Sequence, residues 1–524
     1  MLNFFTPSSL DTDFLLLVCD TLHADIPTST RYIFLRFVMI FWNCDETDMH
    51  HLTTVKNLSN TMLVKPKKLR TNLNLLVDKQ LLTRSKTQGN FRPTDYFKIS
   101  EGFRTKILSK RRELSQKLLD PDVSHPVFPT NQLIGLVQKL LITSTLPISA
   151  LSPDGAEAVQ LSDADRMVLL FLLLNTQHNG IVINCKNSML RQFTGLPKTS
   201  VNVSLQRLRK HQIIRHTVSG VRKNIFIAGS GATHVLNLSH QFWGDAAIFG
   251  DFYVFPYKTK TPCLAALLCD TILEQQDQKS IAQSSNSEFF RDYFFSLTQA
   301  EYAKMVESIH SAITMLTDNT ESFKNFRTMY SNKKPICVEV SATEETSLIG
   351  FLQKARSFNK EFLDTNLYDS VALLLQTVSE QVACYAMQYL SEQISYLRHQ
   401  SIYKPSMVDI FTLKPAIQYV WHRQDDWSDH PELVQLICCI AFYTITLLTR
   451  IGSLPNQPIQ WYKGPFSVIP FQHTYRSAMV IYIRHNQKNQ FIGEDRIHTF
   501  QRDTYQNHSW FSSSFNGQHL TDLQ

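Results

Sequence analysis

One helical pattern occurs twice in the chain, 132 residues apart, and it limits the available folds more than any other feature. In the second copy, apolar residues recur at spacings of four and three, which places them on one face of a helix from Lys198 to Lys210. The first copy repeats this spacing, and in both copies two further apolar residues follow the helix. The positions are Val201, Leu205, Leu208, Ile213 and Ile214 in the second copy and Leu69, Leu73, Leu76, Leu81 and Leu82 in the first.

The segments around each helix predict the same order of elements. Upstream of the second copy, "DADRMVLLFLLLN" predicts a long apolar helix and "KNSMLRQFT" a short one, and Gly195 and Pro197 separate the short helix from the next. Downstream, "IIRHTV" and "KNIFIA" predict two strands around a basic turn, residues 219–223. The first copy offers "TRYIFLRFVMIFWN" as its first helix and "LLTRS" and "YFKIS" as its strands. Each copy is therefore expected to be a helical unit with a small β-hairpin.

The positive charge of the chain is concentrated in the part that contains both copies. Residues 1–240 carry 29 Lys and Arg against 17 Asp and Glu, whereas the remaining residues carry 23 against 28. Residues 166–244 contain ten basic residues and no acidic one, and residues 50–117 contain sixteen against four. Long basic segments of this kind are typical of proteins that bind polyanions. A basic surface that is merely solvated is the alternative.

The segment "MLRQFTGLPKTSVNVSLQRLRKHQIIRH" resembles the winged helix-turn-helix superfamily, in the style of MarR-type and GntR-type bacterial regulators. It is similar to their second helix, tight turn, recognition helix and first wing strand. It departs from them at His211 and Gln212, where an acidic residue and a glycine commonly precede the wing strand, so we expect a different exit from the helix. Two such domains on one chain are also similar in architecture to plasmid replication initiators. The resemblance implies a recognition helix that enters the major groove of duplex DNA.

The predicted outward faces of the two helices carry side chains that can form hydrogen bonds with base edges, and the basic residues beside them and in the wings are expected to bind phosphates. The predicted DNA-contacting residues of the first copy are Lys67, Lys68, Arg70, Asn74, Arg84, Lys86 and Arg92. Those of the second copy are Lys198, Thr199, Asn202, Gln206, Arg209, Lys210, Arg215, Arg222 and Lys223.

The acidic part of the chain is expected to be mostly helical. Residues 367–399 contain one continuous apolar stripe, which requires a partner helix in the same domain or in a second copy of the chain. The uncharged run of residues 433–449 is shorter than the about 20 residues of a membrane span, so we interpret it as a core helix. Further on, "SAMVIYIRHNQ" and "QFIGEDRIHTF" predict a β-hairpin, while "FWGDAAIFGDFYVFPY" is interpreted as a junction and "TPCLAALLCDTILEQ" as a helix.

The sequence contains no recognisable enzyme signature, neither a phosphate-binding G-x-x-x-x-G-K-S/T loop nor a G-x-S-x-G motif. Its nine cysteines include no C-x-x-C pair and are expected to be reduced core thiols, so neither zinc nor another cofactor is predicted. One segment, "HRQDDWSDH", could surround a divalent metal, although helix caps and a solvated acidic loop explain the same residues more simply. Its candidate ligands are His422, Asp425, Asp426, Asp429 and His430.

Together these patterns predict a mainly α protein with small β wings, of the α+β class. Two tandem winged-helix domains, residues 1–118 and 163–240, are joined by a linker with a short helix, residues 119–162. An association or regulatory region, residues 241–524, follows and ends in a β-hairpin. We expect a cytoplasmic, nucleoid-associated regulator of transcription that binds double-stranded DNA sequence-specifically, without a membrane and without enzymatic activity. Self-association through the C-terminal half stays open. The alternatives are a replication initiator or other mobile-element protein, and a nuclease or recombinase with a metal site in the acidic part.

Overall fold

The computed structural model describes the secondary structure of a defined set of residues. They are residues 12–44, 52–86, 94–118, 133–142, 161–176, 178–220, 231–274, 287–294, 297–317, 352, 367–389, 413, 416, 417, 420, 431–453, 465–470, 475–484 and 495–499.

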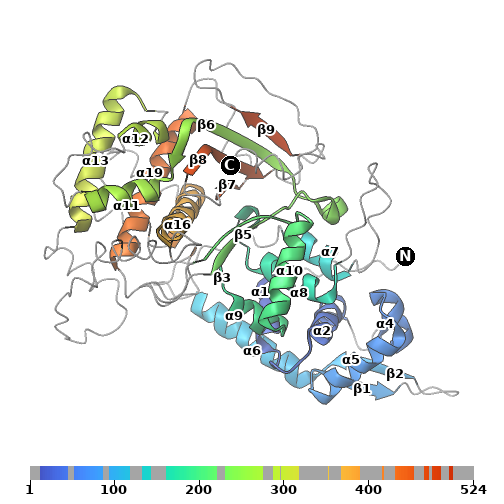
Figure 1. The fold of residues 1–524 in the computed structure, drawn as a ribbon. Helices are drawn as coiled ribbons and strands as arrows, with labels where there is room; N and C mark the ends of the chain where they lie inside the picture. Colours follow the sequence, from blue (N-terminus) through green and yellow to red (C-terminus); the bar gives the residue numbers. More distant parts are fainter. Residues whose placement is uncertain are drawn as a thin grey trace, which may run out of the picture. The chain divides into compact units, whose positions relative to one another are not determined.

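These residues form a mostly helical structure with small, mainly antiparallel sheets, which confirms the expected α+β class (Figure 1). The chain divides into two compact units. Unit 1 consists of residues 1–176, 185–214 and 237–247, and unit 2 consists of residues 177–184, 215–236 and 248–524. The helices of both predicted winged-helix domains therefore belong to unit 1.

Unit 1 contains nine described α-helices, a short 3-10 helix and one β-hairpin. The elements are α1 (Thr12–Thr21), α2 (Thr28–Phe41), α4 (Val55–Met62), α5 (Pro66–Asp78), β1 (Leu82–Lys86), β2 (Asp95–Ile99), α6 (Glu101–Leu118), α7 (Ile134–Ile142), α8 (Asp163–Leu174), α9 (Asn187–Thr194), α10 (Lys198–Lys210) and the 3-10 helix η4 (Gln241–Ala246).

Two apolar helices form the centre of unit 1. α2 and α8 pack against each other and against α7, and nearly all of their side chains are buried. α5 packs on α2, and α9 and α10 pack on α8. α8 begins with a capping box, in which Ser162 and Asp165 bond each other's backbone N–H groups. The buried pair of helices thus carries the long helix of each copy, and the short helix α9 packs on α8 while α4 packs on α5.

The short and long helices of the two copies correspond at every boundary with a shift of 132 residues. α4 corresponds to α9 in this way, and α5 to α10. The long helices also end alike, because Lys79 and His211 both have φ −85° and ψ 7°, and Gln80 and Gln212 follow with φ 58° and 56°. The predicted register is confirmed. The two copies therefore leave the long helix with the same backbone geometry, and the expected difference from the superfamily at His211 and Gln212 stays a prediction.

A strand follows the long helix in both copies. β1 pairs with β2 in antiparallel fashion, as predicted. β4 (Ile214–Val218) also begins as predicted, but the strand beside it is β5 (Ala232–Leu236), while the segment 223–228 lies outside the described residues. The Ser100 N–H donates to the Leu81 carbonyl in the first copy, and the Asn237 N–H donates to the Ile213 carbonyl in the second. β5 therefore occupies the position of β2.

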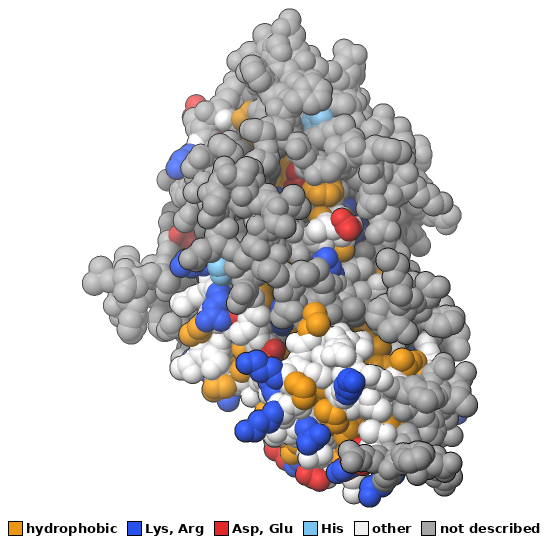
Figure 2. Space-filling view, turned by 90° about the vertical axis from the view of Figure 1, so that its right-hand side faces the viewer, with side chains coloured by type: hydrophobic (Ala, Val, Ile, Leu, Met, Phe, Trp, Pro, Cys, Tyr) orange, Lys and Arg blue, Asp and Glu red, His pale blue; other side chains and the backbone are white. Residues whose placement is uncertain are grey.

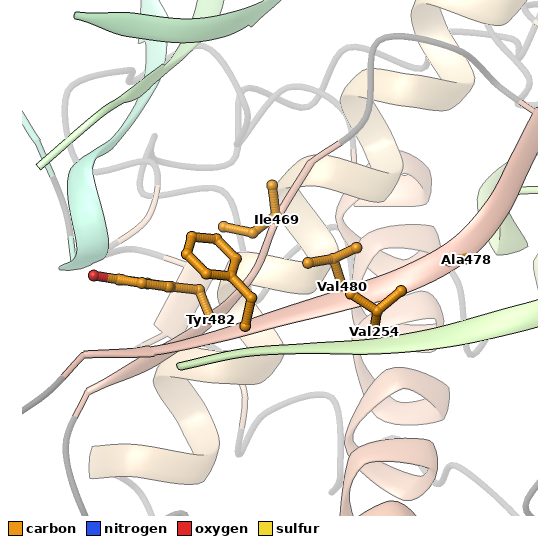
Figure 3. Close-up of a cluster of buried hydrophobic side chains, with 6 residues drawn as sticks. Val254, Ile469, Ala478, Val480 and Tyr482 are labelled. Atoms are coloured by element: carbon orange, nitrogen blue, oxygen red, sulfur yellow. The ribbon is translucent and has the colours of Figure 1, made fainter. Parts of the chain in front are cut away.

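Unit 2 contains two sheets. One has the strand order β3-β5-β4, with β3 at Ile181–Cys185, and the other has the order β7-β8-β6-β9. In the second sheet, β6 (Gly250–Pro262) is antiparallel to β8 (Tyr475–Arg484) and parallel to β9 (Arg496–Thr499), while β7 (Phe466–Val468) lies on the other side of β8. Figure 3 shows Val254 of β6 and Val480 and Tyr482 of β8 in a buried apolar cluster with Ile469.

This sheet corrects two predictions. Residues 475–484 and 496–499 are strands as expected, but they do not pair as a hairpin, because β6 lies between them. The aromatic-rich segment interpreted as a junction, residues 242–257, contains the first part of this central strand. Consecutive residues 252–255 of β6 are apolar and buried, and Phe252 and Val254 share an apolar cluster with side chains of β8, so the partner of β8 is this central strand.

The helices of unit 2 are α11 (Leu264–Glu274), α12 (Ser287–Tyr293), α13 (Gln299–Thr317), α16 (Leu367–Tyr389) and α19 (Pro431–Ser453). α16 packs against α19 and α11, so the apolar stripe of α16 has its partner helices within the same unit. α19 contains a window, Val434–Ile451, that is long and apolar enough to cross a membrane, but 89% of it is buried inside the structure, as expected of a core helix.

A buried ion pair joins the sheet β7-β8-β6-β9 to α16. The Arg476 Nη1 atom of β8 lies 2.7 Å from Glu380 Oε1, and both side chains are at most 1% exposed. Gln376 donates a hydrogen bond to the same carboxylate (2.8 Å) and accepts one from the Ala265 N–H (2.8 Å). Removal of either charge would leave the other buried without compensation, so this contact is expected to be important for the stability of unit 2.

Candidate nucleic-acid interface

The two long helices expose the faces that the sequence predicts as DNA-contacting. Each long helix buries its apolar row and presents polar and basic side chains to solvent. The exposed predicted residues are Lys67, Lys68, Arg70 and Asn74 on α5 and Lys198, Thr199, Asn202, Gln206, Arg209 and Lys210 on α10. The face of α10 carries no carboxylate. Figure 2 shows Lys and Arg side chains spaced among neutral and apolar ones on the lower part of one side of the molecule, with some Asp and Glu side chains at its bottom edge.

A matching polar contact connects the first helix to the long helix in each copy. Thr30, the third residue of α2, donates a hydrogen bond to Asn72 of α5 (2.5 Å). Asp165, the third residue of α8, is hydrogen-bonded by Ser204, the residue equivalent to Asn72. Each long helix is thus fixed by a specific contact beneath its exposed face, and this orients the outward side chains.

Asp165 also holds a basic side chain of α10. Arg207 Nη1 lies 2.6 Å from Asp165 Oδ2, a carboxylate that is fully buried. Burial opposes ionisation of this carboxyl group, but hydrogen bonds from Ser162, Arg207 and Ser204 outweigh burial and lower its pKa. Arg207 is therefore engaged in an ion pair within the protein, whereas Arg209 and Lys210 are exposed to solvent.

The turn before α10 is held by a buried guanidinium from the other copy. Arg31 of α2 is 1% exposed, and its Nη1 atom donates to the carbonyl oxygens of Gln192 (2.8 Å) and Phe193 (2.7 Å) at the end of α9. Its Nε and Nη2 atoms donate to Ile26 and His23 carbonyls (2.9 and 2.8 Å). The last carbonyl oxygens of a helix have no hydrogen-bond donor within the helix, and the Arg31 guanidinium provides donors for those of α9.

Two further contacts join the copies. The Thr28 hydroxyl donates to the Thr194 carbonyl (2.8 Å), and Lys68 Nζ lies 2.7 Å from Asp163 Oδ2 at the start of α8. The first pair closes the end of α9, and the second connects α5 of one copy with α8 of the other. With the packing of α2 on α8, these contacts hold the two helix pairs as one body within unit 1.

The predicted wing residues differ in their surroundings. Lys86 is exposed on β1, and Arg84 is exposed but paired with Asp95 on β2. Arg215 is only 8% exposed at its side chain, pairs with Asp495 (2.8 Å) and lies over the ring of Phe252. Its charge is therefore already compensated. Arg92, Arg222 and Lys223 lie outside the described residues.

Sequence reasoning missed the residues that hold the long helices. Neither Arg31 nor Asp165 is among the predicted site residues, and both side chains are at most 1% exposed. The two arginines occupy equivalent positions, since Arg31 and Arg166 are each the fourth residue of their helix. Each donates through Nε to the carbonyl five residues before it, that of Ile26 (2.9 Å) or Leu161 (3.1 Å). An alignment of the two copies with a shift of 135 residues would have paired them.

No metal site is formed by the part of the chain that the structure describes, in which no three His, Cys, Asp or Glu side chains gather. The predicted candidates around Asp425 and Asp426 lie outside that part. The described cysteines form no disulfide, and most of them are buried. Burial raises the pKa of the Cys185 and Cys384 thiols to about 12, as expected of reduced core thiols.

Comparisons with protein-family models and with curated proteins find no match for this chain.

Proposed function

We propose that the protein binds double-stranded DNA sequence-specifically and acts as a regulator of transcription, with each copy forming a winged-helix domain. The observation that carries the proposal is the duplication. Two helix–turn–helix pairs with the same boundaries and the same exit geometry both present an exposed face of amide and basic side chains. A surface kept for solubility alone would not need the same geometry twice.

In this proposal, α5 and α10 enter the major groove. Arg70 and Asn74 on α5 and Asn202, Gln206 and Arg209 on α10 face base edges, where an amide can pair with adenine and a guanidinium with guanine. Lys67, Lys198 and Lys210 lie at the ends of the helices and bind phosphates, together with Lys86 of the first wing, whereas Lys68 is paired with Asp163. Phosphate contacts fix the position of the protein on the duplex, and base contacts select the sequence.

The contacts between the copies support one continuous binding site. A flexible tether would let each long helix bind a separate DNA segment, but α2 and α8 pack directly and Arg31 bridges both copies. The two helices therefore approach DNA in a fixed relation, and the distance between the two halves of the site is set by the protein. Insertion of about five base pairs, half a helical turn, between the halves should abolish joint binding.

Selection of duplexes from a randomised pool by the full-length chain tests the proposal. We expect one enriched sequence, with an affinity that falls steeply as salt increases. Arg209→Ala and Asn202→Ala should each reduce discrimination against mismatched bases by about 1–3 kcal/mol, whereas Lys198→Ala should weaken all duplexes alike.

Lys304→Ala, at an exposed lysine on α13 of unit 2, is the matched control and should change neither affinity nor preference. Absence of any duplex binding, or equal losses for all four variants on selected and random DNA, would contradict the proposal.

A further inference from the structure

An apolar side chain is exposed in the middle of the polar face of α10. Among the described residues, the large hydrophobic side chains that stand exposed are Leu63 (57%), Leu108 (40%) and Val203 (51%). Val203 alone of these belongs to a helix that we propose to contact DNA. Single exposed apolar residues are ordinary on protein surfaces, so its surroundings decide what it means.

Val203 lies among the residues proposed to contact bases. Thr199 precedes it by four positions and Gln206 follows it by three, so both lie beside it on the surface of the helix, and both are exposed. Valine is also a poor choice for an exposed helix position, because its branched Cβ loses rotamer freedom there. Neither packing nor helix propensity therefore explains a valine at this position.

The equivalent residue of the first copy, Thr71, is also β-branched and exposed. Its hydroxyl donates to the Lys67 carbonyl one turn earlier in the same helix (3.1 Å). Because the hydroxyl is engaged by its own helix, the methyl group is the part of the side chain that remains for an external contact. The two long helices thus offer a methyl group at the same position of their outward faces.

We propose that Val203 and Thr71 each contact the 5-methyl group of a thymine, one in each half of the bound site. This inference rests on the proposed function. Thymine is the base that presents a methyl group in the major groove, and apolar side chains are its complement. Gln206, which lies beside Val203 on the surface of the helix, carries an amide that can pair with adenine, so an A·T base pair can satisfy both neighbours at once.

The test removes the methyl group from the DNA and from the protein separately. The full-length chain is titrated with a duplex selected from a randomised pool, in which each thymine is replaced in turn by deoxyuridine, and the dissociation constant is measured by fluorescence anisotropy. Deoxyuridine differs from thymidine by the methyl group alone. We expect one thymine in each half at which the wild-type chain loses affinity about fourfold, the equivalent of the ~0.8 kcal/mol of one buried CH₂ group.

Val203→Thr and Val203→Ser form the matched protein pair, since both carry a hydroxyl and they differ by one methyl group. In Val203→Thr, replacement of the contacted thymine by deoxyuridine should still reduce the affinity. In Val203→Ser that reduction should disappear, while the reduction at the thymine of the other half should stay as in the wild type. Thr71→Ser should do the reverse. These side chains are exposed, so unchanged circular dichroism and melting temperature are expected for all three variants.

The inference is overturned if the wild-type chain binds the selected duplex but no deoxyuridine weakens it, or if Val203→Ser and Thr71→Ser retain every loss. In both cases the proposed function stands, because binding of the selected duplex is still observed. Failure to select or bind any duplex refutes the proposed function itself and this inference with it.

Discussion

Replacement of Arg31 by methionine should loosen the turn before α10, although Arg31 belongs to the other copy. Its buried guanidinium donates four hydrogen bonds to carbonyl oxygens, two of them across to α9. A hydrogen bond from a charged donor contributes about 1.5–3 kcal/mol, and the bonds are not additive. We therefore expect the substitution to lower the free energy of unfolding by about 3–5 kcal/mol, in the range found when a buried charged contact is broken.

Arg166→Met is the matched control, since Arg166 is the equivalent residue of the second copy. It is half-buried and donates to the Leu161 carbonyl (3.1 Å) and to the Tyr32 hydroxyl of α2 (3.1 Å). Its loss should cost about 1 kcal/mol, the contribution of an ordinary hydrogen bond.

Hydrogen exchange of the full-length chain, followed by mass spectrometry, distinguishes the two variants. A chain with two units need not unfold in one step, so a local measurement is preferable to a global midpoint. Arg31→Met should accelerate exchange in peptides of α9 by roughly 100-fold, which corresponds to about 3 kcal/mol. The reasoning is refuted if α9 exchanges at the wild-type rate in Arg31→Met, or if Arg166→Met accelerates it equally.

Three further predictions concern stability. Gly195→Ala should lower the melting temperature, since a Cβ would lie 3.0 Å from Arg31 Nε at a residue with φ 71°. Leu63→Gly at the equivalent turn (φ 48°) should raise the free energy of unfolding by about 1 kcal/mol. Shifts of the same sign in the two variants would contradict this reasoning. Burial lowers the pKa of His216 to about 4, so the unfolded chain takes up the proton first and unit 2 should lose about 2–3 kcal/mol between pH 7 and 4.5. His216→Gln should remove that part of the pH dependence in urea titrations. Glu380→Gln leaves a buried guanidinium without its charge partner and should cost about 3–5 kcal/mol, and a denaturation midpoint equal to wild type would rule this out.

The local elements of unit 1 could be predicted from the sequence because their signals are short-range. The helix from Lys198 to Lys210 has the predicted bounds, since Pro197 precedes its first turn and the apolar row ends with Leu208. The repeat with a shift of 132 residues identified the corresponding helix, and it identified most of the outward residues correctly as exposed.

Pairings between distant segments could not be predicted in the same way. Residues 223–228 lie outside the described residues, and the described strand beside β4 is β5, after which the Asn237 N–H bonds to the Ile213 carbonyl, a contact that no local pattern reveals. β8 pairs with β6, more than 200 residues earlier, because the strands bury a shared apolar face. The burial of Arg31 follows from carbonyls that become available only when α9 has ended beside it.

The division of the chain into two units has a topological consequence. The polypeptide crosses from one unit to the other after residues 176, 184, 214, 236 and 247. A single cut therefore cannot release either unit as a continuous fragment, and a truncation after residue 240 would remove part of unit 1 while retaining strands of unit 2. On the ribosome, unit 1 cannot be completed until residue 247 has emerged, by which point β4 and β5 have already been synthesised. Neither unit can therefore be synthesised alone, or moved to another protein, as one continuous segment of chain.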